Sequence, residues 1–284
     1  MNIVVSAAEM QTMAEQARLQ GRTIGLIPTM GYLHEGHLSL VEMAKRSCDV
    51  IITSIFVNPT QFAPNEDFAR YPRDLQRDTE LCRSAGSTVL FTPEQNEMYP
   101  DGYSTFVSVD GISSLLEGKF RPTHFRGVTT IVAKLFLLTK PHRAFFGQKD
   151  AQQCVVVKKI VKDLRFDIEI IVAPIVREKD GLAMSSRNVY LSPQERSEAT
   201  ILHASLRRAE QLAGSGERSA ANIVRAMKSM IQQKQNAVID YVEIVDADTL
   251  SALDRIEKGI PALAVLAVRF GATRLIDNAL ITVR

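Results

Sequence analysis

The hydrophobic and polar positions of the first 175 or so residues form strand-like and helix-like segments that alternate along the chain. Short apolar runs, several rich in β-branched residues, predict buried strands, and apolar residues spaced three and four apart predict amphipathic helices. The predicted strands cover residues 23–28, 50–57, 88–92, 143–147 and 167–173, and the predicted helices cover residues 7–20, 37–47, 73–85, 125–139 and 151–163. Such alternation is typical of βαβ units around a parallel sheet, with ligands bound where the strands end.

The pattern changes after residue 190. Ser192, Pro193 and Glu195 predict a capping box with proline in the first turn of a helix that should run to about Ala213. A second helix is predicted over 217–234, followed by three strands of an antiparallel sheet over 239–245, 262–270 and 275–283. We therefore expect an α/β, Rossmann-like domain over residues 1–175 and a smaller α+β domain over 176–284, with the boundary between 174 and 190.

Composition excludes several classes of function. The 34 Lys and Arg residues nearly balance the 32 Asp and Glu residues, which gives no support for a nucleic-acid or membrane surface built on bulk charge. The N-terminus shows no signal-peptide pattern, and apolar runs such as 262–268 are too short to span a bilayer. Three widely spaced cysteines predict reduced thiols. We expect a cytoplasmic protein.

The segment 28–37, Pro-Thr-Met-Gly-Tyr-Leu-His-Glu-Gly-His, lies between a predicted strand and a predicted helix. A strand-to-helix turn with glycine is expected to leave free backbone N–H groups at the positive end of the helix dipole, where an anion is favoured. His34 and His37 are three residues apart, so both imidazoles can face that anion. Imidazole donates hydrogen bonds and can carry positive charge near neutral pH. The segment therefore predicts a phosphate site.

Two further segments follow predicted strands. In residues 56–62, Asn58 and Gln61 offer uncharged donors and acceptors suited to hydroxyl and carboxylate groups, although Asn-Pro alone is more simply explained as a turn. In residues 146–150, Lys149 could bind phosphate and Asp150 could bind ribose hydroxyls. The alternative, that Asp150 caps a helix and Lys149 is solvated, stays open.

Residues 183–188 form a loop without a periodic pattern. Ser185, Ser186 and Arg187 could clamp phosphate oxygens, or could belong to an ordinary polar loop. The segment is similar to the mobile Lys-Met-Ser-Lys-Ser loop of adenylate-forming enzymes but lacks both lysines, whose charge Arg187 and Lys149 could replace.

The other histidines and one aspartate are interpreted as structural. His124 and Arg126 precede a predicted helix and are expected to fix a loop, and His142 and His203 are expected to be solvent-facing or satisfied in packing. Asp78 could neighbour a metal, but we interpret it as part of a solvated helical face. The sequence also lacks a P-loop, a Gly-x-Gly-x-x-Gly dinucleotide motif, a Gly-x-Ser-x-Gly elbow and a His-Glu-x-x-His motif.

Taken in order, the motifs resemble those of one family, the pantoate–β-alanine ligases of the nucleotidylyl-transferase superfamily. They are Pro-Thr-Met-Gly-x-Leu-His-x-Gly-His at 28–37, Phe-Val-Asn-Pro-x-Gln-Phe at 56–62, Gly-x-Lys-Asp-x-Gln-Gln at 147–153 and Met-Ser-Ser-Arg-Asn at 184–188. Arg-Tyr-Pro-Arg at 70–73, Glu-Gly at 117–118 and His-Phe-Arg-Gly-Val at 124–128 extend the resemblance over nearly the whole chain. Thr60 and Gln148 replace residues frequent in the family, at variable motif positions.

The resemblance implies joining of pantoate to β-alanine with ATP and Mg²⁺ through a pantoyl-adenylate, in a homodimer whose smaller domain closes over the site. It implies His37, His34, Lys149 and Arg187 as catalytic residues. The implied substrate-binding residues are Gln61, Gln153 and the supporting Asn58, and the metal ligands are unknown. The implied ATP-binding residues are Met30, Gly31, Tyr32, Leu33, His34, Glu35, Gly36, His37, Gly147, Gln148, Lys149, Asp150, Val176, Met184, Ser185, Ser186 and Arg187.

Two other functions fit parts of the sequence. A nucleotidylyltransferase would keep the nucleotide on its product, but the two glutamines and the long second domain argue against it. A non-catalytic nucleotide- or RNA-binding relative is disfavoured by the near-neutral charge and by the presence of both histidines, Lys149 and Arg187. Release or retention of AMP separates these functions from a ligase.

Overall fold

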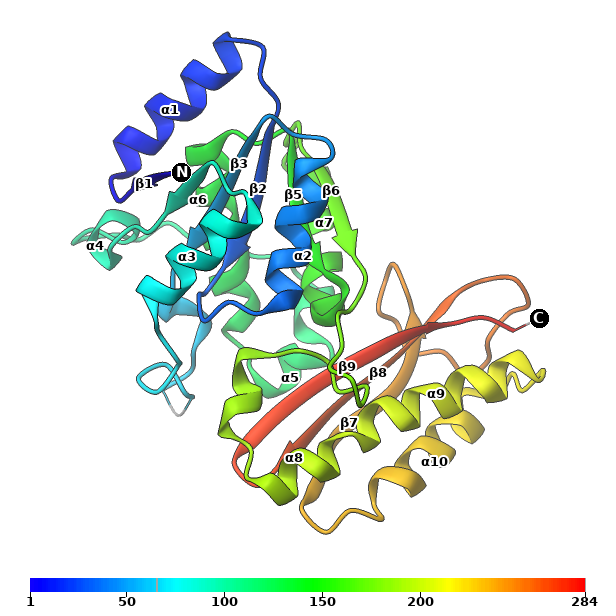
Figure 1. Ribbon diagram of the computed structural model, residues 1–284. Helices are drawn as coiled ribbons and strands as arrows, with labels where there is room; N and C mark the ends of the chain where they lie inside the picture. Colours follow the sequence, from blue (N-terminus) through cyan, green and yellow to red (C-terminus); the bar gives the residue numbers. More distant parts are fainter. Residues whose placement is uncertain (65, 284) are drawn as a thin grey trace. The chain divides into compact units, whose positions relative to one another are not determined.

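The structure is a computed structural model that describes residues 1–64 and 66–283, and it divides into two compact units (Figure 1). One unit holds Met1–Gln148 and Gln152–Pro174, and the other holds Lys149–Ala151 and Ile175–Arg284. The first is an α/β unit and the second contains helices and a small antiparallel sheet. The predicted fold class is therefore confirmed.

The first unit is built on a six-stranded parallel sheet with the spatial order β1-β4-β3-β2-β5-β6. The strands are β1 (Asn2–Val4), β2 (Ile24–Thr29), β3 (Val50–Ile55), β4 (Val89–Phe91), β5 (Arg143–Gly147) and β6 (Glu169–Ala173). Because β2 lies between β3 and β5, the strand order reverses there. Open parallel sheets bind ligands beyond the carboxyl ends of the strands at such a reversal.

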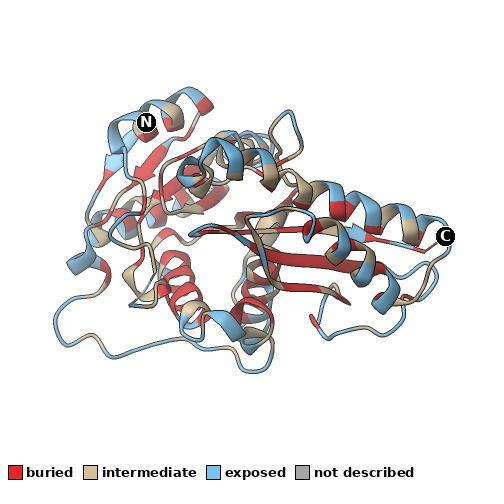
Figure 2. Cartoon of the chain, turned by 90° about the horizontal axis from the view of Figure 1, so that it is seen from below, coloured by how far each residue is buried: buried red, intermediate tan, exposed pale blue. Residues whose placement is uncertain are grey.

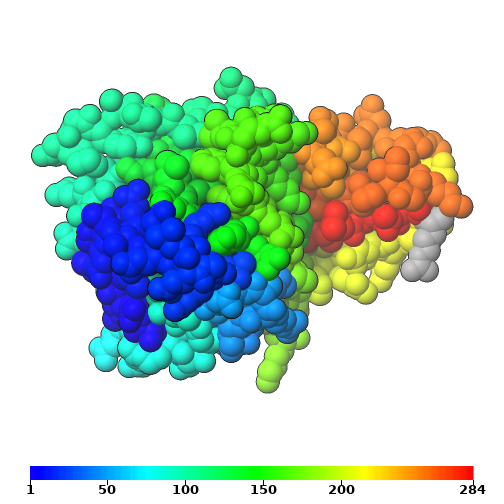
Figure 3. All heavy atoms as spheres, turned by 90° about the horizontal axis from the view of Figure 1, so that it is seen from above, coloured from blue at the N-terminus to red at the C-terminus, as the bar shows by residue number. Residues whose placement is uncertain are grey.

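Helices cover both faces of this sheet because its strands carry apolar residues on both sides. Leu26 of β2 packs with α1 and α6, and the adjacent Ile27 packs with α2. Figure 3 shows the N-terminal segment, in dark blue, on the surface of this unit. The helices are α1 (Ala7–Leu19), α2 (Glu35–Lys45), α3 (Leu75–Ala85), α4 (Gln95–Met98), α5 (Glu117–Phe120), α6 (His124–Thr139) and α7 (Ala151–Asp163).

The second unit packs helices on a three-stranded antiparallel sheet of order β7-β8-β9. Its elements are α8 (Pro193–Ala199), α9 (Ile201–Gly214), α10 (Ala220–Ile231), β7 (Ala237–Asp246), β8 (Ala262–Phe270) and β9 (Thr273–Ile281). The central strand β8 is almost wholly buried, as the red strands of Figure 2 show.

The predicted elements are all present, with ends shifted by a few residues, but two details differ. The predicted capping box of Ser192 and Glu195 is confirmed, whereas the single helix predicted after it is divided at Thr200, whose hydroxyl donates to the Ser197 carbonyl. The short elements β1, α4 and α5 were not predicted, because three or four residues are too few to show a period.

Ser54 on β3 carries a buried hydroxyl that makes no hydrogen bond to any described residue. An unsatisfied buried polar group costs about 1–3 kcal/mol, so Ser54→Ala is expected to raise the free energy of unfolding by about 1 kcal/mol. The neighbouring Thr53 hydroxyl lies 2.7 Å from that of Ser87, so Thr53→Val is the matched control and is expected to lower it. Denaturant unfolding measures both; equal destabilisation by the two changes would contradict the prediction.

Candidate active site

The loop after β2 is held in a tight turn by a buried carboxylate. Gly31 and Tyr32 have φ angles of 85° and 51°, in the left-handed region that a side chain rarely occupies. Asp78 on α3 accepts hydrogen bonds from the backbone N–H groups of Tyr32 at 2.6 Å and Leu33 at 2.8 Å. These two charge-assisted bonds hold the strained turn in place and so set where α2 begins.

The interpretation of Asp78 as part of a solvated helical face is wrong. Its side chain is 1% exposed, and burial raises its pKa although the two N–H bonds and Arg77 oppose that shift. The sequence pattern could have predicted this burial, because Asp78 shares a helix face with the buried residues Cys82 and Ala85.

His34 and His37 form the cap of α2. The Nδ1 atom of His34 accepts from the Gly36 N–H at 3.2 Å, and the Nδ1 atom of His37 accepts from the His34 N–H at 3.3 Å. The ring centroids lie 4.1 Å apart. Since both Nδ1 atoms act as acceptors, the hydrogen of each neutral ring is assigned to Nε2. The donor group of each neutral imidazole is therefore its Nε2–H.

The expectation of free backbone N–H groups in this turn is not met at residues 31–34 and 36. The Gly31 N–H donates to the Thr29 hydroxyl, Asp78 takes the next two, and the imidazoles take those of His34 and Gly36. The backbone donors of these residues are therefore used inside the protein. An anion at this helix end would instead be bound by the imidazoles, whose Nδ1 atoms connect them to the backbone donors of the helix.

Beyond β3, Asn58 orients Gln61. The Asn58 amide group donates to the Gln61 Oε1 atom at 2.8 Å and to the Gly127 carbonyl at 3.1 Å, and its Oδ1 atom accepts from Tyr99 at 2.9 Å. Asn58 is fully buried, and its side-chain bonds go to protein groups, one of them the Gln61 side chain. Because Oε1 of Gln61 is occupied, its Nε2 group remains as a donor for a carboxylate or hydroxyl.

The start of α6 holds the backbone of Gln61. His124 donates through Nδ1 to the Gln61 carbonyl at 3.0 Å, and Arg121 donates to the same carbonyl at 3.2 Å while pairing with Glu66 at 2.6 Å. Arg126 instead stacks on the ring of Phe106, with its guanidinium carbon 3.8 Å from the centroid. His124 and Arg121 thus hold the backbone of Gln61 in place.

Burial and the neighbouring Arg121 lower the pKa of His124 to about 4, although Gln61, Glu117 and Glu66 oppose the shift. The unfolded chain binds a proton near pH 6.5 and the folded chain does not, so this residue's contribution to stability is complete above pH 6.5 and is lost as the pH falls toward 4. We expect a loss of up to about 3 kcal/mol in the free energy of unfolding over that range. His124→Asn should flatten the pH dependence measured by denaturant unfolding. The same slope in both proteins would contradict the assignment.

The end of β5 leads to two adjacent glutamines with different surroundings. Gly147 ends β5 and its carbonyl accepts from Cys154 at 3.4 Å. Gln152 is buried, donating to the carbonyls of Ile112 and Leu115 and accepting from the Glu117 N–H. Gln153 is only half-buried, and its side chain makes no hydrogen bond to any residue in 1–64 and 66–283, so it remains available to a substrate.

Gln148 ends the first segment of the first unit, whereas Lys149, Asp150, Val176 and residues 184–187 belong to the second unit. The Lys149 Nζ atom lies 3.6 Å from an Asp150 carboxylate oxygen. Val176 and Met184 are brought together by a hydrogen bond from the Met184 N–H to the Val176 carbonyl at 3.0 Å. Ser185 caps a short 3₁₀ helix that contains Ser186 and Arg187, through a bond of 3.2 Å to the Arg187 N–H. The sequence motif 184–188 is thus an ordered turn.

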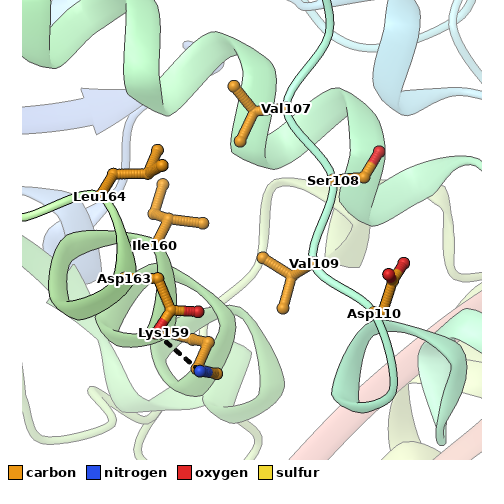
Figure 4. A pocket seen from close by; sticks show the side chains of 8 residues that line it. All are labelled: Val107, Ser108, Val109, Asp110, Lys159, Ile160, Asp163 and Leu164. Carbon is orange, nitrogen blue, oxygen red and sulfur yellow. Dashed lines mark hydrogen bonds and ion pairs between the residues drawn. The ribbon is translucent and has the colours of Figure 1, made fainter.

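A surface pocket of about 360 Å³ on the first unit is separate from these residues. Val107, Val109 and Ile160 form its apolar wall, and Lys159 pairs with Asp163 within one turn of α7 (Figure 4). None of the predicted site residues lines it. Among residues 1–64 and 66–283 there is no group of three His, Cys, Asp or Glu that could hold a metal. The helices of the same residues include none that is long and apolar enough to cross a membrane.

Comparisons with known proteins cover the whole chain. The family described as pantoate-beta-alanine ligase matches residues 2–280. Curated relatives named pantothenate synthetase are 58% identical in Acetivibrio thermocellus, over 100% of both chains, and 54% identical in Moorella thermoacetica, over 100% of this chain and 99% of the relative.

Solved structures agree in fold as well as sequence. Pantothenate synthetase from Thermus thermophilus has a TM-score of 0.92 at 46% identity and covers 98% of this chain and 99% of its own. Pantoate-beta-alanine ligase from Francisella tularensis, named as complexed with beta-gamma ATP and β-alanine, has a TM-score of 0.81 at 35% identity, over 99% and 97% of the two chains. The reversal of strand order at β2, the paired imidazoles beyond it and these matches together show that the chain belongs to the pantoate–β-alanine ligase family.

Proposed function

We propose that this protein condenses pantoate with β-alanine at the expense of ATP, through a pantoyl-adenylate. The observation that carries the proposal is the paired imidazoles at the reversal of strand order, with the donor group of Gln61 beyond the neighbouring strand. The ligand names of the Francisella relative support ATP and β-alanine as substrates.

In the first step, a pantoate carboxylate oxygen attacks the α-phosphorus of ATP and pyrophosphate leaves. The protein performs little covalent chemistry here, because its task is to position the reactants and to stabilise charge on the phosphoryl oxygens. We assign the Nε2–H donors of His34 and His37 to those oxygens, and Lys149 and Arg187 to the phosphate charge. Met30–Gly36 and Ser185–Ser186 lie along the nucleotide in this proposal.

In the second step, the β-alanine amine attacks the activated acyl carbon and AMP leaves. Gln61 and Gln153 hold pantoate, with Gln61 also near β-alanine and Asn58 behind it. The ribose and adenine would be bound by Gly147, Asp150, Met184 and the backbone of Val176, with Gln148 also along ATP. We propose that the second unit supplies the segment that shields the mixed anhydride from water.

Mg²⁺ enters this proposal as part of the substrate, MgATP. Mg²⁺ prefers oxygen ligands and usually keeps several waters when it binds phosphates. The two oxygens of Asp78 are engaged by backbone N–H groups, and no three-residue cluster is present among the described residues, which fits an ion held by ATP phosphates and water. The proposal also includes a cytoplasmic location and a homodimer; light scattering on the purified protein tests the homodimer.

The decisive experiment follows pyrophosphate and AMP separately. Purified protein is given MgATP and pantoate, and pyrophosphate is measured; β-alanine is then added and AMP is measured. Pantoate-dependent pyrophosphate followed by β-alanine-dependent AMP is the expected result. Retention of AMP on the final product would indicate a nucleotidylyltransferase, and activity on a different acid would change the substrate assignment.

A further inference from the structure

Two consecutive buried polar residues, Asp277 and Asn278, interrupt the apolar run of strand β9 between Leu275 and Ile281. On β9, Leu275, Ala279 and Ile281 face the core of the second unit, and Asp277 lies on that same face by its spacing. Asp277 and Asn278 are each only 3% exposed. Burying a carboxylate is costly unless it is paired and hydrogen-bonded, so the partners of this aspartate show what it does.

Asp277 binds the base of the hairpin formed by residues 176–184. Its Oδ2 atom lies 2.6 Å from Nη1 of Arg177 and its Oδ1 atom lies 3.0 Å from Nη2, a bidentate pair. Nη1 of Arg177 also donates to the Gly181 carbonyl at 3.1 Å. The guanidinium therefore connects the first arm and the turn of the hairpin to the sheet.

This hairpin determines where Val176 and Met184 lie. Arg177 pairs with Ala183 across it, and the Met184 N–H donates to the Val176 carbonyl in the next pair along. Val176 is adjacent to Arg177 in the chain, and Met184 is adjacent to Ala183, the cross-strand partner of Arg177. Loss of the Asp277 pair would release the Arg177 guanidinium from the sheet, and the hairpin that carries Val176 and Met184 would be held less firmly.

Asn278 lies on the other face of the same strand and contacts the segment that contains Lys149. Its amide nitrogen donates to the Lys149 carbonyl at 3.0 Å. The Asn278 N–H also donates to Oδ1 of Asp277 at 2.8 Å, so the two side chains belong to one hydrogen-bonded network. Asp277 and Asn278 of β9 are thus bonded to the two segments of the second unit that we assign to ATP, residues 176–187 through Arg177 and residues 149–150 through Lys149.

We propose that Asp277 and Asn278 are positioning residues for ATP, Asp277 through Arg177 for the adenine-binding backbone and Asn278 for the phosphate-binding Lys149. The inference rests on the proposed assignment of Val176 and Lys149 to ATP. Neither residue touches the nucleotide in this account. Substitution of either residue should raise KM for ATP more than KM for pantoate, because the proposed pantoate-binding residues lie in the first unit.

The same sheet offers a matched control for a purely structural role. Asp240 on β7, 9% exposed at its side chain, pairs with Arg274 at 2.6 Å and with Arg269 at 3.1 Å. The partners of Asp240 are thus arginines on β8 and β9, and not residues of the segments 149–150 or 176–187. Asp240→Asn therefore weakens a comparable ion-pair cluster without touching an ATP segment.

The experiment compares Asp277→Asn, Asn278→Leu and Asp240→Asn in the full-length protein. KM for ATP and KM for pantoate are measured from pyrophosphate release, and ATP binding is measured directly by calorimetry. Asp277→Asn and Asn278→Leu are expected to raise KM and the Kd for ATP about tenfold, with KM for pantoate unchanged. Asp240→Asn is expected to change neither KM, even where thermal unfolding shows a loss of stability.

Equal effects on ATP and pantoate, or an equal effect of Asp240→Asn on ATP, would overturn the proposal. If Asp277→Asn fails to fold, Asn278→Leu decides, because it leaves the ion pair intact. A wild-type protein that binds ATP but releases no pyrophosphate with pantoate would contradict the proposed function alone. The calorimetric comparison would still test the positioning role in that case.

Discussion

His37→Ala is expected to slow pantoate-dependent pyrophosphate release by about 10²–10³-fold while the fold is retained. That is the usual effect of removing one donor that stabilises charge in a transition state. His37 accepts the His34 N–H at Nδ1, so its Nε2–H is the group that we assign to the phosphoryl oxygens. Single-turnover measurement of pyrophosphate isolates this step from the later attack by β-alanine.

Two further substitutions distinguish the role of the His37 Nδ1 atom from that of its Nε2 atom. Asparagine can place an acceptor where Nδ1 lies, and glutamine can place a donor near Nε2, so His37→Gln should be more active than His37→Asn. His142 is the matched control, because its Nδ1 atom also accepts a backbone N–H, that of Ile24 at 3.0 Å, but at the opposite end of the sheet. His142→Ala should stay active. Turnover near that of the wild type in His37→Ala would remove His37 from the mechanism.

The sequence could predict the positions of three candidate segments because each of the three follows a recognisable apolar run. The histidines follow β2, Gln61 follows β3 and Lys149 follows β5, and each of these strands is a short, largely buried run of five or six residues. The order of the strands could not be obtained from the same patterns, since it depends on pairing between distant segments. That order explains why β2 and β5 end side by side.

The residues that support the site were missed for a different reason. Asp78 was interpreted as solvated because it is charged, and Asp277 was not singled out at all, although each occupies an inward position of a helix or strand pattern. Their partners are backbone groups and an arginine, 45 and 100 residues away respectively, which no local pattern reports. A carboxylate at a buried position of a periodic segment is the signal that could have found both.

Gly127→Ala is expected to reduce kcat/KM for pantoate by about 10²-fold, because a displacement of roughly 1 Å at a positioned ligand costs about that much. A Cβ atom on Gly127 would lie 2.3 Å from the Thr60 carbonyl oxygen and 2.7 Å from the Gln61 nitrogen. These are backbone atoms that no side-chain rotation can move away. The segment carrying Gln61 must therefore shift, which also strains the Asn58 bond to the Gly127 carbonyl.

The stability of the same variant shows whether the clash is real. Overpacking typically lowers the free energy of unfolding by about 1–3 kcal/mol, against a gain of up to about 1 kcal/mol from the helix propensity of alanine. A Cβ atom on Gly214, at the end of α9, would have no neighbour within 4 Å, so Gly214→Ala isolates the propensity gain. Loss of pantoate use in Gly127→Ala with KM for ATP retained would locate the damage at Gln61. A Gly127→Ala protein as stable and as active as Gly214→Ala would show that α6 and the Asn58–Gln61 turn are not in close contact, and that Gln61 is positioned by other means.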